Sequence, residues 1–134
     1  MTLFYGVLDA ATRSLWWTSG GHDPPFWLRP RTGEMEELPN TGVPLGILED
    51  ATYEQAGPVT LETGDVLLIG TDGIWEAANP RRELFGKQRL RDLLIATAEK
   101  SAAEIHGAII RAVHDFRATQ PQADDITLVV IKAV

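Results

Sequence analysis

Cysteine is absent from the 134 residues of this chain. A thiol nucleophile, a disulfide framework and a cysteine-ligated zinc or iron–sulfur site are therefore excluded. The sequence also lacks an apolar run of about 20 residues, the length needed to span a membrane. Its first residues, Met1-Thr2-Leu3-Phe4, lack the basic region of a signal peptide. We therefore expect a cytoplasmic protein that does not interact with membranes.

Basic residues are few, because 12 Lys and Arg stand against 19 Asp and Glu, for a formal net charge of -7. A phosphate backbone attracts positively charged surfaces, so nucleic acid is not expected as a partner. The acidic excess is compatible with a divalent-cation site, although composition alone favours a simple role in solubility. Hydrophobic residues (44%) and charged residues (23%) occur at ordinary globular levels, which predicts one folded domain over residues 1–134.

Several common catalytic motifs are missing as well. The sequence contains no GxxxxGK[ST] phosphate loop, no HExxH, no GxSxG and no GxGxxG. Nucleotide kinase, zincin, serine-hydrolase and Rossmann-type functions therefore lack the residues that their chemistry needs.

Apolar patterning predicts a strand-rich first part and a helical second part. Strands are expected at residues 3–9, 14–18, 26–28, 65–70 and 126–134. The first is apolar on both faces, so we expect it to be covered on both sides, and the last two are expected to be central. Residues 29–58 are rich in Pro and Gly and are expected to be mostly loop.

Two helices are expected between the last two strands. The first covers residues 87–99, and the second extends from Ser101 to about residue 119, where Ser101 and Glu104 form a capping box. Strands followed by helices, without a βαβ rhythm, predict an α+β layered fold.

Acidic residues flank the two strongly apolar strands near the C-terminal end. Asp72 and Gly73 follow the first of them, where a carboxylate beside a glycine suits a cation or a phosphate; a plain Asp-Gly turn is the alternative. Asp124 and Asp125 precede the second, and a cation between them would offset their repulsion; a solvated loop is the alternative. Because both pairs lie at strand ends, the sequence favours a shared site.

His22 follows Ser19-Gly20-Gly21 directly after a predicted strand. Its imidazole could act as a general acid, a phosphate donor or a metal ligand. A hydrogen bond to a neighbouring loop is the alternative.

Five motifs occur in a recognisable order: SGGHDPP at 19–25, GVPLG at 42–46, GDVLLIGTDGIWEAANP at 64–80, Phe85-Gly86 and ADDITLVV at 123–130. Together they resemble the stage II sporulation protein E family, whose members are metal-dependent serine/threonine phosphatases related to protein phosphatase 2C. The resemblance extends over nearly the whole chain.

The resemblance implies part of an αββα four-layer sandwich around two Mn²⁺ or Mg²⁺ ions. Asp72 matches the metal ligand of the TDG motif and Asp124 matches the first acid of the C-terminal motif. Gly73 shapes the ligand turn, while Asp125 and His22 are weaker candidates. The implied substrate is a phosphoserine or phosphothreonine protein, such as an anti-sigma-factor antagonist.

The family's acidic G-D-x-x-D motif, its D-x-x-G-K/H-G segment and a long helix do not occur in residues 1–134. We therefore expect this chain to supply half of the metal site, to bind Mg²⁺ or Mn²⁺ weakly and to show little phosphatase activity alone. Apolar surface left open by the missing part favours a homodimer or a completing chain. The alternative is a non-catalytic interaction module that retains the phosphatase fold.

Overall fold

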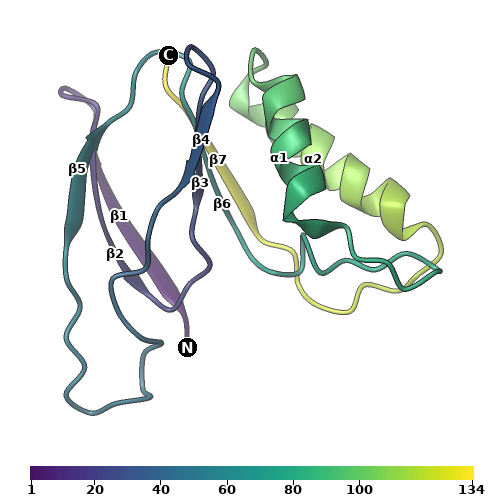
Figure 1. Ribbon diagram of the computed structural model, residues 1–134, viewed down its shortest axis with the longest axis horizontal. Helices are drawn as coiled ribbons and strands as arrows, with labels where there is room; N and C mark the ends of the chain where they lie inside the picture. Colours follow the sequence, from purple (N-terminus) through teal and green to yellow (C-terminus); the bar gives the residue numbers. More distant parts are fainter.

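A computed structural model describes all residues 1–134 and shows three layers, a sheet, a second sheet and a pair of helices (Figure 1). The elements in chain order are β1 (Leu3–Asp9), β2 (Ser14–Gly20), β3 (Phe26–Arg29), β4 (Glu34–Glu37), β5 (Ala56–Thr60), β6 (Val66–Gly70), α1 (Gly86–Thr97), α2 (Ala102–Arg117) and β7 (Leu128–Lys132). The first sheet has the order β1-β2-β5 and the second the order β4-β3-β6-β7, with every pair antiparallel. The predicted α+β class is confirmed.

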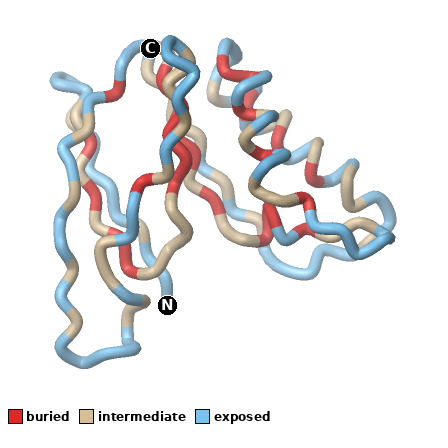
Figure 2. The backbone as a smooth tube through the Cα atoms, viewed as in Figure 1, coloured by how far each residue is buried: buried red, intermediate tan, exposed pale blue.

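Two apolar cores hold the layers together (Figure 2). The larger lies between the second sheet and the helices, where Leu68 of β6 and Ile109 of α2 are fully buried. The smaller lies between the two sheets and includes Trp17, Trp27 and Leu67. Alternate residues of β6 therefore contribute to both cores, which explains why its sequence is apolar on both faces.

Strand β1 differs from its prediction, because only its inner face is covered. Phe4 packs toward the core between the sheets, but Leu3, Tyr5 and Val7 are 44%, 62% and 49% exposed. Strand β1 is an edge strand, and no layer formed by residues 1–134 packs on its outer side. The expectation that residues 3–9 are covered on both faces is therefore wrong for this chain.

The order of strands corrects two further expectations. Strand β7 pairs only with β6, so it lies at the edge of its sheet and is not central. The stretch expected to be loop contains β4 and β5, which are also edge strands. Charged residues in β4 and Pro58 in β5 hide the strand pattern in the sequence, and both residue types are tolerated at a sheet edge.

Helix α2 begins as its sequence predicts. The Ser101 hydroxyl accepts a hydrogen bond from the Glu104 N–H at 3.3 Å, and the Glu104 carboxylate accepts one from the Ser101 N–H at 2.9 Å. The capping box is therefore complete. Hydrogen bonds from the Ser101 hydroxyl, then from its backbone N–H, lower the pKa of Glu104.

We expect Ser101→Ala to lower the free energy of unfolding by about 1 kcal/mol, the usual cost of losing an N-cap side chain. Because the pKa of Glu104 is lower in the folded state, its contribution is complete above the ordinary glutamate pKa and is lost as the pH falls through the folded-state value. Urea unfolding at neutral and acidic pH measures this. The difference in unfolding free energy between the wild type and Ser101→Ala should become smaller at acidic pH. The difference between the wild type and Glu104→Gln should shrink in the same way, whereas Glu99→Gln, which lies outside the capping box, should show no such change.

Neither helix has the length and apolar character required to cross a membrane.

Candidate metal centre

Asp72 lies in the turn that directly follows β6. The apolar residues of that strand anchor the turn in the core, and the turn is closed by hydrogen bonds from the Ile74 N–H to the Thr71 carbonyl at 3.1 Å and from the Glu76 N–H to the Asp72 carbonyl at 2.8 Å. Its neighbours Ile74 and Trp75 are buried. The backbone that carries the half-buried Asp72 is therefore fixed on both sides.

Asp124 and Asp125 lie in the loop that leads from α2 into β7. Strands β6 and β7 are antiparallel neighbours, and Gly70 pairs with Leu128 where β6 ends and β7 begins. The loop after β6 and the loop before β7 therefore meet at one edge of the second sheet. This brings the backbone segments of Asp72 and Asp124 together although 52 positions separate them in the chain.

Thr71 ties these two loops together. Its hydroxyl donates a hydrogen bond to the Asp125 carbonyl at 3.1 Å and accepts one from the Thr127 N–H at 3.0 Å. Its own N–H donates to the Thr127 carbonyl at 3.1 Å. The sequence predicts no role for Thr71, whose only distinguishing feature there is its position between Gly70 and Asp72 in the TDG motif.

Gly73 permits the close approach of the two loops. A Cβ atom at this position would lie 2.4 Å from the Asp125 carbonyl oxygen and 3.4 Å from that of Asp124. Both are backbone atoms and cannot rotate away. The absence of a side chain at Gly73 is therefore a requirement of this geometry.

We expect Gly73→Ala to destabilise the fold by roughly 1–3 kcal/mol, because the added methyl group must push the loops apart. Gly107→Ala is the matched control, since its Cβ would meet only the flexible end of Arg111, at 3.1 Å, and alanine favours a helix. Thermal unfolding of both variants measures the difference. Equal melting temperatures for the two would contradict the close approach.

The donor chemistry of Asp72 and Asp124 fits a hard divalent cation, which prefers carboxylate oxygens. Within residues 1–134, no group of three or more His, Cys, Asp or Glu side chains is placed to hold a metal ion. This chain therefore supplies at most a pair of such ligands at this edge. Asp125 follows Asp124 directly, and the Asp125 N–H donates to the Asp124 carboxylate at 2.7 Å.

His22 lies outside these two loops, in the segment between β2 and β3. Its ring is 6.4 Å from the Phe4 ring, and its buried Nε2 has no hydrogen-bond partner. The hydrogen bond to a neighbouring loop that was the alternative role is therefore not formed through this atom. His22 and the two carboxylates do not form a three-ligand group.

Asp23 lies next to His22 in the motif at 19–25. Through Lys87 it connects this motif to the turn that carries Asp72. The Lys87 ammonium lies 3.5 Å from the Asp23 carboxylate and 5.0 Å from the centre of the Trp75 ring. Segments from three of the sequence motifs thus meet at the start of α1. We assign this contact a structural role.

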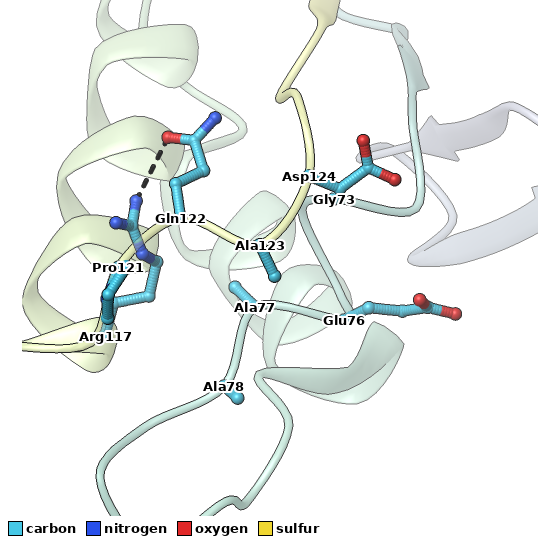
Figure 3. Close-up of a pocket in the computed structure, with 9 residues that line it drawn as sticks. All are labelled: Gly73, Glu76, Ala77, Ala78, Arg117, Pro121, Gln122, Ala123 and Asp124. Atoms are coloured by element: carbon cyan, nitrogen blue, oxygen red, sulfur yellow. Dashed lines mark hydrogen bonds between the residues drawn. The ribbon is translucent and has the colours of Figure 1, made fainter.

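A small pocket adjoins Asp124 (Figure 3). Glu76 and Asp124 are on one side, Arg117 and Gln122 are on the other, and alanine side chains lie between them. Gly73 also lines it, so the pocket is continuous with the edge that carries the candidate ligands. Arg117 and Gln122 belong to no sequence motif, and Glu76 lies within the motif at 64–80 but has no role predicted from the sequence.

Solved structures place this architecture among phosphatase 2C-type domains. The SiaA-PP2C domain of Pseudomonas aeruginosa superposes with a TM-score of 0.82 at 22% identity, covering 99% of this chain and 52% of that one. The phosphatase domain of SpoIIE from Bacillus subtilis (Mn presoaked) gives a TM-score of 0.70 at 20% identity, covering 98% and 56%. The chain therefore has the fold of a large part of a phosphatase 2C-type domain.

The family model of stage II sporulation protein E matches residues 1–134, and the chain belongs to this family. Protein IcfG from Synechocystis is 34% identical over 97% of this chain and 20% of its own length. Phosphoserine phosphatase RsbP from Bacillus subtilis is 24% identical over 97% of this chain and 30% of its own length. The chain thus spans less than a third of each of these two relatives.

Proposed function

We propose that residues 1–134 form part of a metal-dependent phosphatase domain that hydrolyses phosphoserine or phosphothreonine on a protein. The observation that carries this proposal is the meeting of the Asp72 and Asp124 loops, which Thr71 ties together and Gly73 allows to approach. The similarity to the phosphoserine phosphatase RsbP of Bacillus subtilis supports the same chemistry.

In this proposal Asp72 and Asp124 hold Mn²⁺ or Mg²⁺, two ions in a complete site. Such ions polarise water and offset the negative charge of a phosphate. Gly73 keeps the two carboxylate-bearing loops in register, and Thr71 prevents them from separating. Other ligands come from polypeptide outside residues 1–134, since these residues contain no three-ligand group.

We propose a phosphorylated regulatory protein of the cytoplasm as the substrate, an anti-sigma-factor antagonist in particular. The family membership supports this choice. The net charge of -7 argues against a nucleic-acid partner.

Mn²⁺ binding tests the proposed site even if the affinity is low. Paramagnetic Mn²⁺ should broaden the amide signals of residues 71–73 and 124–127 in an NMR titration, and Asp72→Asn or Asp124→Asn should abolish that local broadening. Asp92→Asn is the control, because this exposed aspartate of α1 removes the same charge elsewhere. Broadening that is unchanged in the first two variants would favour a non-catalytic interaction module.

The outer face of the first sheet supports a completing partner. Leu3, Tyr5 and Thr18 line a shallow apolar hollow there together with Leu45 and Tyr53. We propose that this face is covered in the functional protein, by a second copy or by neighbouring polypeptide, because exposed apolar surface favours association. Sedimentation of this chain should show self-association that Tyr5→Asp weakens, and a monomer at all concentrations would exclude the homodimer.

A further inference from the structure

The pocket beside Asp124 contains a cation that residues 1–134 leave unpaired. The Arg117 guanidinium donates from Nη1 to the Gln122 side-chain oxygen at 3.2 Å and from Nη2 to the Gln120 carbonyl at 3.1 Å. Both acceptors are uncharged. The buried Nε of Arg117 has no hydrogen-bond partner at all.

Lys87 and Arg91, two other half-buried basic side chains, have carboxylate partners, whereas half-buried Lys132 donates only to the Ala98 and Lys100 carbonyls. Lys87 lies 3.5 Å from Asp23, and Arg91 lies 2.5 Å from Glu37. Arg117 forms no such pair, although the chain has an excess of acidic residues. A held arginine with spare donors and no counter-ion is suited to a carboxylate supplied by a ligand.

The charges of the pocket are divided between its two sides. The carboxylates of Glu76 and Asp124 lie on the side of the candidate metal ligands, and Arg117 with Gln122 lies on the opposite side (Figure 3). A ligand that carries a negative charge in addition to its phosphate would have that charge repelled by Glu76 and attracted by Arg117. The small side chains of Ala77, Ala78 and Ala123 leave the space between the two sides open.

The spacing suits a peptide. Gln122 and Asp124 are two residues apart in one loop, so their Cα atoms are separated by at most about 7 Å. An extended peptide covers the same distance in two residues. An extended peptide that runs alongside this loop, with its phosphorylated residue at Asp124, therefore places a side chain two positions away beside Gln122, whose side-chain oxygen accepts a hydrogen bond from Arg117.

We propose that this pocket is a specificity subsite in which Arg117 binds an acidic side chain located two residues from the phosphorylated residue of the substrate. The part concerning the phosphorylated residue rests on the proposed phosphatase function. Arg117 contributes to recognition and does not touch the reacting atoms. Gln122 holds the guanidinium in place.

Peptide binding to this chain in the presence of Mn²⁺ tests the subsite, with fluorescence anisotropy as the readout. Three labelled phosphoserine peptides carry Glu, Gln or Lys at both positions two residues from the phosphoserine. We expect the Glu peptide to bind about fivefold more tightly than the Gln peptide, the upper end for a partly exposed ion pair. Arg117→Gln should remove this preference, and Arg117→Glu should reverse it in favour of the Lys peptide.

A reversal cannot result from unfolding, and Arg111→Gln, an exposed arginine on the same helix, should retain the wild-type preference. Equal binding of the Glu and Gln peptides to the wild-type chain, a preference unchanged in Arg117→Glu, or no measurable binding of any peptide would overturn the proposal. Unphosphorylated versions separate the two ideas. If they bind as tightly as the phosphopeptides, with the Glu preference intact, the phosphatase proposal fails and the acidic subsite remains.

Discussion

Asp72→Asn is expected to lower Mn²⁺-dependent hydrolysis of p-nitrophenyl phosphate at least about 100-fold in a polypeptide that joins residues 1–134 to the acidic-motif half of a related domain. The loss should reach or exceed the range found when an outer-shell partner of a metal ligand is removed, because a carboxylate ligand itself is lost. Asp124→Asn should have a similar effect, since the two side chains serve one site. Initial rates at saturating Mn²⁺ provide the measurement.

Asp92→Asn controls for the lost negative charge and should retain wild-type activity, because this residue lies on the exposed face of α1. The chain without added polypeptide should show little turnover with the same substrate. Strong Mn²⁺-dependent turnover by residues 1–134 alone, abolished by Asp72→Asn, would show that no further ligands are needed.

Phe26→Ala is expected to lower the free energy of unfolding by about 3–5 kcal/mol, the usual cost of emptying a buried aromatic site. Phe26 is only 1% exposed and contacts Trp75 edge to face, with ring centres 6.3 Å apart. Trp75 lies in the turn that carries Asp72. The cavity should therefore loosen the metal edge as well as the core.

Tyr5→Ala provides the comparison, because this aromatic residue lies on the open face of β1 and is 62% exposed. Its effect on unfolding should stay within about 1 kcal/mol. Urea denaturation of both variants gives the two values. A cost for Phe26→Ala no larger than that for Tyr5→Ala would contradict the assignment of Phe26 to the main core.

The helices could be read from the sequence because their signals are local. The capping box of Ser101 and Glu104 marks the start of α2, and apolar residues recur with helical spacing after it. Strands β4 and β5 could not be read in this way. Their charged and proline residues are acceptable only because each strand lies at a sheet edge, and edge position is a property of the assembled sheet.

The sequence pattern of β1 likewise does not reveal its position in the assembled sheet. Its residues are apolar on both faces, which indicates two covering layers, but residues 1–134 provide only one. A sequence pattern records what a strand is suited to pack against. It does not record which polypeptide supplies the second layer.

The sequence indicates some residues of the candidate site, and only the structure shows the others. Asp72 and Asp124 stood out because each lies beside a strongly apolar strand and within a family motif. Thr71 and Arg117 did not stand out, since their roles consist of contacts with residues distant in sequence or with a pocket. The pairing of β6 with β7 is what creates those contacts.

Local patterns in the sequence alone thus determined the apolar strands, the two helices, the absence of thiol chemistry and the identity of two candidate ligands. The tertiary structure decided which strands are neighbours, and so that Asp124 returns to the loop of Asp72 although 52 positions separate them in the chain. It also decided that one face of β1 stays open and that Arg117 lacks a counter-ion. The physical reason is that helix signals come from residues a few positions apart, whereas strand order, burial and charge pairing depend on residues that only the folded chain brings together.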